Sequence, residues 1–462
     1  MPRDSRYLLL LFVISAAVVA VAKSPCPTQV LQGSLAAHSG DLICIVPQLY
    51  GPGGLVGTNN GGPLTPTTGH EVHFQDSNLS SFGAVNAAIG VQVSQIPIGS
   101  PVSGFIFTAG ALQPVESFGP ILTDRAETIG KHKIYLGFSY QFFNFDGVDG
   151  VNLKQFGAVF THEPEPTVCQ TQPTVPCIVV NGQLQPIYTQ DVVSTLNRID
   201  LKINQYAIVG TYGLTNKLDV SLLVPILNVR MGMFSNATIF NFEPPPVNHS
   251  FGAPLAPYSA NFVDHNSKSG IGDLTLRGKF LAWQDSKEKS AVAVGLDIRL
   301  PTGNAYDFLG SGTWGVRPWA NYTYSGRVSP HASVGFQGNG SSVLAGDVTT
   351  QPVTKAQLPN VFTYSAGADA QIFRWLSASG AFIGQSLLNA QRIKADTFTD
   401  YAGTPHQNIT TYTGTVNQES IALGGKVEPI SKLLVSLNVL FRVNNAGLHS
   451  KPAPLIGISY LF

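Results

Sequence analysis

Period-two alternation of apolar and polar residues recurs through the last two thirds of this 462-residue chain. From Asp273 to Phe280, the odd positions are polar or charged and the even positions are apolar or glycine. Residues 290–300 and 433–443 follow the same scheme. Such alternation places the apolar side chains on one face of a strand. It fits a soluble β-sandwich, where that face forms the core, and equally a transmembrane barrel, where it meets lipid.

The connections between the predicted strands separate these two folds. Tight turns at 215–217, 285–289, 325–327, 373–374 and 429–432 alternate with longer segments, of which 146–193 is the longest. Short turns at one rim and long loops at the other are typical of outer-membrane barrels. We therefore predict an all-β, antiparallel transmembrane β-barrel of 12 strands. The predicted strands are 131–145, 194–213, 217–234, 269–284, 289–300, 313–325, 327–338, 360–372, 375–393, 411–429, 432–444 and 453–462.

Both ends of the chain agree with a location in the outer membrane. Residues 1–22 combine Arg3 and Arg6, an apolar run and Ala20-Val21-Ala22, which is the pattern of a secretory signal peptide cleaved after Ala22. An even number of strands returns the C-terminus to the short-turn rim, which we expect to be periplasmic. Long loops such as 235–267 and 337–359 are then expected to face outside the cell.

Composition limits the classes of partner. Charged residues make up 12% of the chain, about half the usual share for a soluble domain. The net charge is zero, so the sequence gives no indication of a nucleic-acid partner. After the signal peptide no apolar run approaches the roughly 18 residues of a membrane-spanning helix.

Aromatic residues gather near the ends of the predicted strands, as in the interfacial girdles of barrels. This set is Trp283, Trp314, Trp319, Tyr322, Tyr324, Trp375 and Tyr460. At the C-terminus, Ile456, Ile458, Tyr460 and Phe462 share one parity. We expect this last strand to close the barrel against the first one, with its apolar face toward lipid.

Residues 23–130 lie before the regular strands. They contain glycine-rich pieces and apolar stretches at Ala87 to Val93 and Val102 to Leu112. They are expected to form either a plug inside the lumen or one further hairpin, which would raise the number of strands to 14. The predicted organisation is thus signal peptide 1–22, plug or periplasmic segment 23–130 and barrel 131–462.

The four cysteines allow three disulfide connectivities. The favoured pairing joins neighbours, Cys26 to Cys44 and Cys169 to Cys177, because the barrel topology separates the two pairs. Metal binding by these cysteines is disfavoured, since no histidines stand at the spacing of a zinc site.

The chain lacks the common catalytic signatures. G-x-S-x-G, H-E-x-x-H and G-x-x-x-x-G-K-[ST] are all absent from the sequence. A G-x-G-x-x-G match at 310–315 precedes a predicted strand rather than a helix, so the geometry that holds a phosphate is missing. The prediction is a protein that is not an enzyme and that has no cofactor and no metal site.

Charged residues on the polar parity form the candidate site. Either they pair with one another to stabilise the barrel interior, or they line a conduction path as charged rings do in pores. Both interpretations place them in the lumen. The set is Asp200, Lys202, Asp219, Asp273, Arg277, Lys279, Asp297, Arg299 and Arg317.

Several of these residues lie in motifs that resemble a known family. Residues 270–280, GIGDLTLRGKF, and 295–304, GLDIRLPTGN, are similar to elements of the barrels named after the phenol meta-cleavage pathway. The resemblance extends over about 190–462 and is most specific between 270 and 340. It implies uptake of hydrophobic or aromatic compounds, in a design similar to long-chain fatty acid and hydrocarbon channels. The final Phe462 resembles the signal recognised by the barrel assembly machinery.

The expected function is a passive outer-membrane channel for small hydrophobic or aromatic molecules. The expected ligand pocket combines Phe138 to Phe145 with the 242–258 loop, and Arg299 and Arg317 are its polar candidates. Two alternatives remain open, a structural or adhesive barrel and a general polar porin. The expected partners are small hydrophobic molecules, outer-membrane lipids and the assembly machinery, with no nucleic acid.

Overall fold

The computed structural model describes residues 26, 39–50, 58–59, 62–63, 79–96, 105–108, 111–114, 125–162, 164–171, 175–242, 249–251, 258–350, 352–373, 375–430 and 432–462. The predicted signal peptide and most of the 242–258 loop lie outside these residues.

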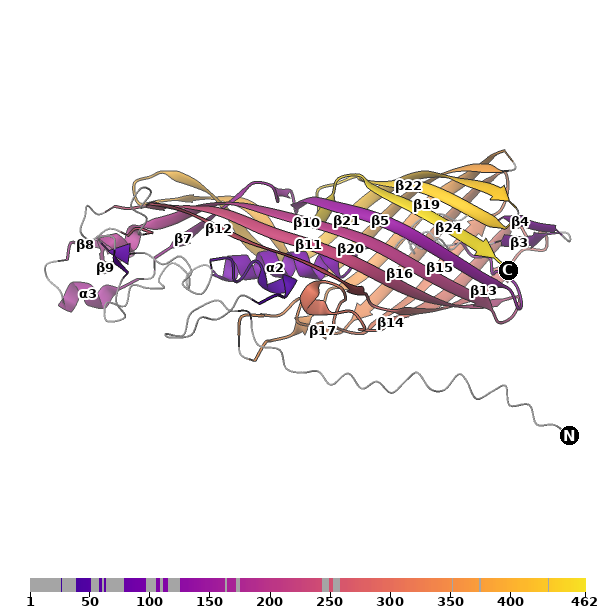
Figure 1. The fold of residues 1–462 in the computed structure, drawn as a ribbon, viewed down its shortest axis with the longest axis horizontal. Helices are drawn as coiled ribbons and strands as arrows, with labels where there is room; N and C mark the ends of the chain where they lie inside the picture. Colours follow the sequence, from indigo (N-terminus) through magenta and orange to yellow (C-terminus); the bar gives the residue numbers. More distant parts are fainter. Residues whose placement is uncertain are drawn as a thin grey trace, which may run out of the picture.

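Twelve antiparallel strands form one closed barrel, so the predicted fold class and number of strands are confirmed (Figure 1). The first strand, β5, pairs with β10 on one side and with the last strand, β24, on the other. This pairing leaves the barrel wall without a free edge. The wall consists of β5 (Ile134–Val148), β10 (Val192–Gly213), β11 (Leu218–Phe240), β13 (Thr275–Gln284), β14 (Ser290–Arg299), β15 (Gly315–Tyr324), β16 (Val328–Asn339), β19 (Asn360–Phe373), β20 (Leu376–Thr399), β21 (Pro405–Ile430), β22 (Leu433–Arg442) and β24 (Ala453–Leu461).

The predicted tight turns all lie at one rim, where the C-terminal strand also ends (Figure 1). At the other rim several predicted loops are strands instead. Strand β12 (Ser259–Ile271) continues the line of β13 and pairs with the outer part of β11, while β20 and β21 extend into a long hairpin. The barrel therefore rises well beyond the roughly 10 residues per strand that cross a bilayer.

An outer extension covers this rim. It contains β6 (Val151–Asn152), β7 (Phe156–Thr161), α3 (Pro166–Thr171), β8 (Cys177–Val180), β9 (Gln183–Pro186), η4 (Ile187–Gln190) and β23 (Leu448–Ser450). The predicted disulfide between Cys169 and Cys177 is present and joins α3 to β8. Further short elements are β1 (Thr58–Asn59), β2 (Gly62–Pro63), β3 (Phe105–Thr108), β4 (Ala111–Pro114), η5 (Ala305–Asp307), β17 (Ser341–Ser342) and β18 (Ala356–Gln357).

Part of the N-terminal segment lies inside the barrel, near the rim opposite the short turns (Figure 1). The helix α2 (Leu79–Val93) contacts β20, β21 and β23, and the short helix η1 (Leu42–Cys44) contacts η5 and β12 (Figure 1). The described side chains of α2 are buried or nearly so on every side, as expected of a helix without a charged face. We call residues 39–50 and 79–96 the plug.

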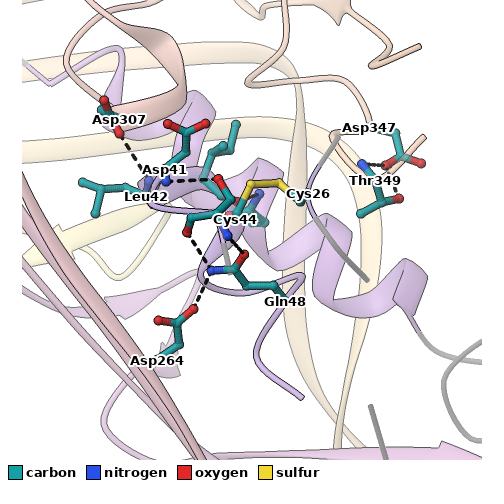
Figure 2. Close-up of a disulfide and its surroundings, with 12 residues drawn as sticks. Cys26, Asp41, Leu42, Cys44, Gln48, Asp264, Asp307, Asp347 and Thr349 are labelled. Carbon is teal, nitrogen blue, oxygen red and sulfur yellow. Dashed lines mark hydrogen bonds between the residues drawn. A yellow bond between two sulfur atoms is a disulfide. The ribbon is translucent and has the colours of Figure 1, made fainter. Parts of the chain in front are cut away.

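Covalent and polar contacts hold the plug in place (Figure 2). The predicted disulfide between Cys26 and Cys44 is present. From β12, Asp264 Oδ2 accepts a hydrogen bond from Gln48 Nε2 at 2.7 Å. Asn86 Nδ2 of α2 donates to the Ile43 carbonyl at 2.9 Å, so the two parts of the plug are also linked to each other.

The polarity of the wall reverses along its length. Near the short-turn rim, β10 exposes Tyr206, Ile208 and Tyr212 on its outer face. Nearer the outer rim, the same face carries Arg198, Asp200 and Lys202, while the lumen face is apolar and packs on the plug. We call the two parts the membrane half and the outer half. Among the described residues, no helix is long and apolar enough to cross a membrane.

Candidate functional site

A row of three charged side chains crosses the lumen face of the membrane half. Arg277, Asp297 and Arg317 are direct cross-strand neighbours on β13, β14 and β15. The Asp297 carboxylate accepts two hydrogen bonds from Arg277, at 2.8 and 2.9 Å, and two from Arg317, from Nε at 3.0 Å and from Nη2 at 2.5 Å. It also accepts from Trp319 Nε1 at 2.9 Å. All three charges are almost fully buried, so each depends on its partners for the solvation lost on leaving water.

Asp273 organises the loop that follows β14. Its carboxylate accepts from the Gly303 N–H at 3.0 Å and from the Ser311 N–H at 2.7 Å. The loop can approach this closely because it carries glycines. A Cβ atom added at Gly310 would lie 2.3 Å from Asp273 Oδ1 and 2.7 Å from the Gly303 Cα. The motifs at 270–280 and 295–304 therefore fold the loop inward, against the end of the plug.

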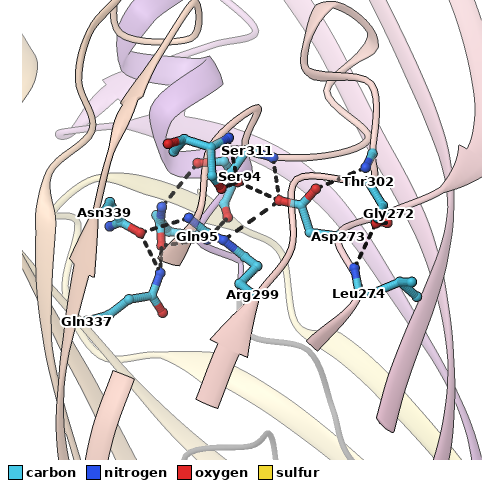
Figure 3. A network of polar contacts seen from close by, with 12 residues as sticks. Ser94, Gln95, Gly272, Asp273, Leu274, Arg299, Thr302, Ser311, Gln337 and Asn339 are labelled. Carbon is cyan, nitrogen blue, oxygen red and sulfur yellow. Dashed lines mark hydrogen bonds and ion pairs between the residues drawn. The ribbon is translucent and has the colours of Figure 1, made fainter. Parts of the chain in front are cut away.

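Arg299 joins the wall to the plug (Figure 3). Its Nη1 donates to the Ser94 carbonyl at 3.3 Å and to Gln95 Oε1 at 3.4 Å, at the C-terminal end of α2. Its Nη2 donates to Asn339 Oδ1 at 2.8 Å, and its Nε lies 3.7 Å from Asp273 Oδ2. A cation at a helix C-terminus interacts favourably with the last carbonyl groups. Arg299 is thus a link between the plug, the inward loop and the barrel wall.

A cavity of about 140 Å³ lies where these parts meet. Its polar lining includes Asp297, Arg299 and Arg317, and its apolar lining includes Ile96 and Ile203. A second cavity of about 80 Å³ is lined by Phe143, Phe145 and Leu440 on its apolar side. Both cavities are also lined by Ile96 and Gln385. The end of the plug therefore separates two small spaces that could communicate if Ile96 moved.

Residues 125–130 occupy the lumen nearer the short-turn rim. Lys279 Nζ donates to the Glu127 carbonyl at 2.6 Å, and the Ile129 N–H donates to Asp219 Oδ2 at 3.0 Å. Burial opposes ionisation of the Glu127 side chain, but Arg125 and a hydrogen bond from Ser325 outweigh it, so the pKa of Glu127 lies below its ordinary value. Asp219 and Lys279 thus hold a second N-terminal segment inside the barrel.

Seven of the nine charged residues singled out from the sequence lie in the lumen. They are Asp219, Asp273, Arg277, Lys279, Asp297, Arg299 and Arg317. Asp200 and Lys202 instead lie on the outer surface, where Asp200 pairs with Lys154 and Arg198. The physical reason is the reversal of polarity: both stand above the lipid-facing band, where water makes the outer face the polar one.

Other positions also differ from expectation. Trp319 lies buried in the lumen beside Asp297 rather than in an interfacial girdle. In the first strand, Phe143 and Phe145 line a cavity, whereas Phe138, expected in the same pocket, is exposed on the outer face because its parity is opposite. Most of the 242–258 loop is outside the described residues. Among the lining residues that sequence reasoning missed are Ile96 and Gln385, which carry no motif. Among the described residues, no group of three or more His, Cys, Asp or Glu could hold a metal ion.

Two solved structures are similar to this chain at low sequence identity. An outer membrane channel from Pseudomonas putida F1 is 10% identical, with 73% of this chain and 98% of that chain covered and a TM-score of 0.41. A FadL homologue from Pseudomonas aeruginosa is 11% identical, with coverages of 72% and 90% and a TM-score of 0.30. No curated protein matches the chain.

A family profile described as "Putative MetA-pathway of phenol degradation" matches residues 192–396. This segment runs from β10 to β20 and includes Asp273, Asp297, Arg299 and the inward loop. Residues 192–396 of this closed β-barrel are therefore similar to the family described as the putative MetA-pathway of phenol degradation.

Proposed function

We propose that this barrel is a passive channel for small hydrophobic or aromatic molecules. The observation that carries the proposal is the 140 Å³ cavity, where Ile96, Ile203 and Leu227 face Arg299 and Arg317. A cavity of about 150 Å³ lined by apolar side chains can hold a benzene molecule. Ligand pockets are commonly apolar with a few placed polar groups, as here.

The proposed route runs past the end of the plug. A solute would enter the space beside Phe143 and Phe145, pass Ile96 and reach the cavity below. Arg299 and Arg317 would donate hydrogen bonds to a hydroxyl group on the solute, while the apolar lining would contact its ring. Movement of residues 125–130 would then release the solute toward the short-turn rim.

Uptake by cells expressing single variants tests the route. Ile96→Trp adds bulk between the two cavities, so uptake of a radiolabelled monocyclic aromatic compound is expected to fall at least tenfold. Val263→Trp adds a similar side chain on the exposed outer face of β12 and serves as the matched control. Uptake that survives depletion of cellular energy is expected for a passive channel.

Other outcomes would replace the proposal. Unchanged aromatic uptake in a folded Ile96→Trp variant would reject this route. Free passage of hexoses with no preference for apolar solutes would favour the general polar porin. A deletion strain that loses surface attachment but keeps normal uptake would favour the adhesive alternative.

A further inference from the structure

Two basic side chains face each other on the outer surface of the barrel. Lys202 of β10 and Arg230 of β11 are direct cross-strand partners, and both are exposed. Like charges in this arrangement destabilise a sheet. Arg230 Nε donates to Asn228 Oδ1 at 3.2 Å, and among the described residues no carboxylate forms a salt bridge with either side chain. The pair therefore forms a site of positive potential that an anion would stabilise.

The pair has a defined height on the barrel. Side chains that face outward and are cross-strand neighbours form rows around the barrel. The row two steps from the pair toward the short-turn rim contains Tyr140, Tyr206 and Ile226. These residues belong to the lipid-facing band, and the two tyrosine rings lie 5.0 Å apart. The row between consists of Phe142, Asn204, Asn228 and Ser269. Lys202 and Arg230 are thus the first charged row above the apolar band on these strands. This is the height at which lipid headgroups begin.

Polar groups around the pair are already ordered. Tyr140 Oη donates to Asn204 Oδ1 at 2.8 Å, and Asn228 Nδ2 donates to Ser269 Oγ at 2.8 Å. Above the pair, Asp200 is held by Lys154 at 2.7 Å and by Arg198 at 2.8 Å. Around Asp200 lie four basic side chains, Lys154, Arg198, Lys202 and Arg230. A further carboxylate nearby, Asp146 of β5, is paired with Arg442, so the net charge of this surface is positive.

We propose that Lys202 and Arg230 bind the phosphate group of a lipid in the outer leaflet. Guanidinium and ammonium groups both donate charge-assisted hydrogen bonds to phosphate oxygens. Their long apolar stems can lie along the barrel wall while the charged ends reach the headgroup. The apolar band directly below accommodates the acyl chains of the same lipid. Exposed Lys451, whose N–H donates to the Asn144 carbonyl in the same row, flanks the site.

The proposed lipid site does not depend on the proposed transport of hydrophobic molecules. Lys202 and Arg230 lie on the outside of the wall, whereas their chain neighbours Leu201, Ile203, Val229 and Met231 face the plug. The inference uses the membrane orientation of the barrel but not the proposed transport. A barrel that binds lipid normally and fails to take up aromatics would leave this inference intact.

Lipid binding by the full mature protein in detergent tests the proposal. The probe is bisphosphorylated lipid A, and complexes are counted by native mass spectrometry. Replacing Lys202→Gln and Arg230→Gln together should weaken binding by roughly 30-fold, since each basic residue at a membrane surface contributes about a factor of five. Lys287→Gln, in the turn between β13 and β14 at the opposite rim, is the matched control and should bind like the unaltered protein.

Three controls decide the interpretation. Heat-modifiable migration on gels checks that the double variant forms the barrel, and a Lys202→Arg variant should keep the affinity. Dephosphorylated lipid A should bind no better to the unaltered protein than to the double variant. Equal binding of lipid A to both proteins would overturn the proposal. Competition by inorganic phosphate at the same concentration as lipid A would show a free-anion site and would also overturn it.

Discussion

The two halves of this barrel have opposite distributions of apolar and polar side chains between the outer face and the lumen face. In the membrane half, the outer face is apolar and the lumen contains the buried charges Arg277, Asp297 and Arg317. In the outer half, the lumen face of β10 is apolar, at Ile199, Leu201 and others, and the outer face is polar. The strands are continuous across the change. What reverses is the surroundings: lipid outside one half, and water outside the other.

Because of this difference, the interior of the barrel is stabilised by different interactions in the two halves. Charges in the membrane half are satisfied by cross-strand partners in the wall and by residues 125–130. The outer half has instead the apolar core of a globular domain, with α2 at its centre. A solute that crosses the barrel would therefore meet apolar contacts first and charged groups second. Disturbing the two halves should produce different defects.

The largest expected effect follows from removing the central carboxylate of the membrane half. Asp297→Leu leaves Arg277 and Arg317 buried without their shared partner, and breaking such a pair costs about 3–5 kcal/mol. We expect the free energy of unfolding in lipid vesicles, measured by urea titration, to fall by that amount. The control Asp200→Leu affects exposed ion pairs in the outer half and should cost less than about 1 kcal/mol. Equal losses would remove the distinction between the halves.

The next effect belongs to the apolar core of the outer half. Leu201→Ala leaves a cavity against the plug and should lower the free energy of unfolding by about 2–5 kcal/mol. Ile208→Ala, on the same strand but facing lipid, leaves no enclosed cavity and should cost clearly less. Chemical denaturation of both variants in vesicles provides the comparison. A larger loss for Ile208→Ala would mean that the lumen face is not a packed core.

These variants also mark how far the sequence could predict the structure. Alternation and turn spacing located all twelve strands to within six residues at either end, because each strand must expose one apolar face to lipid. Asp200, Lys202 and Trp319 were misplaced by the same rule. It assumed that polar and charged residues line the lumen along the whole strand and that strand-end aromatics face outward. The position along a strand at which the surroundings change from lipid to water depends on the whole barrel, so the local sequence pattern does not predict it.

The cavity was less predictable than the wall. Asp273, Arg299 and Arg317 belong to recognisable motifs, so they were candidates from the start. Ile96 and Gln385 carry no such signal. Ile96 reaches the cavity because a segment about 200 residues before Arg299 folds back into the lumen, and Gln385 lies on the wall strand β20 outside the motifs. The apolar stretch at 87–93 was visible, and it suggested a plug, but the contacts of that plug depend on tertiary packing.

A smaller effect is expected where the two halves meet. Arg299→Gln removes charge-assisted contacts to Ser94, Gln95 and Asn339, of which the two to the plug are long, at 3.3 and 3.4 Å. The total loss should therefore be about 1.5–3 kcal/mol. We expect faster hydrogen exchange in 79–96 with little change in the wall strands. Arg327→Gln, in an exposed turn at the other rim, is the control and should leave exchange in the plug unaltered. Faster exchange throughout the barrel would instead identify Arg299 as a general stabiliser of the wall.

The smallest effect on the barrel should come from the outer extension. Replacing Cys169 and Cys177 together by serine removes a disulfide that closes only a short loop between α3 and β8. The transition temperature of the barrel should change by no more than a few degrees, while proteases should cleave 164–186 faster. A large fall in the transition temperature would mean that the extension is part of the barrel's cooperative unit.

The reversal of polarity can be measured directly with spin labels at Leu196 and Ile208. Both residues are apolar, exposed and on the outer face of β10, so only their height differs. In vesicles, a label at position 208 should collide often with oxygen, which partitions into lipid, and rarely with a water-soluble nickel chelate. A label at 196 should show the opposite preference. Lipid-like behaviour at both positions would contradict the division of the barrel into a membrane half and an outer half.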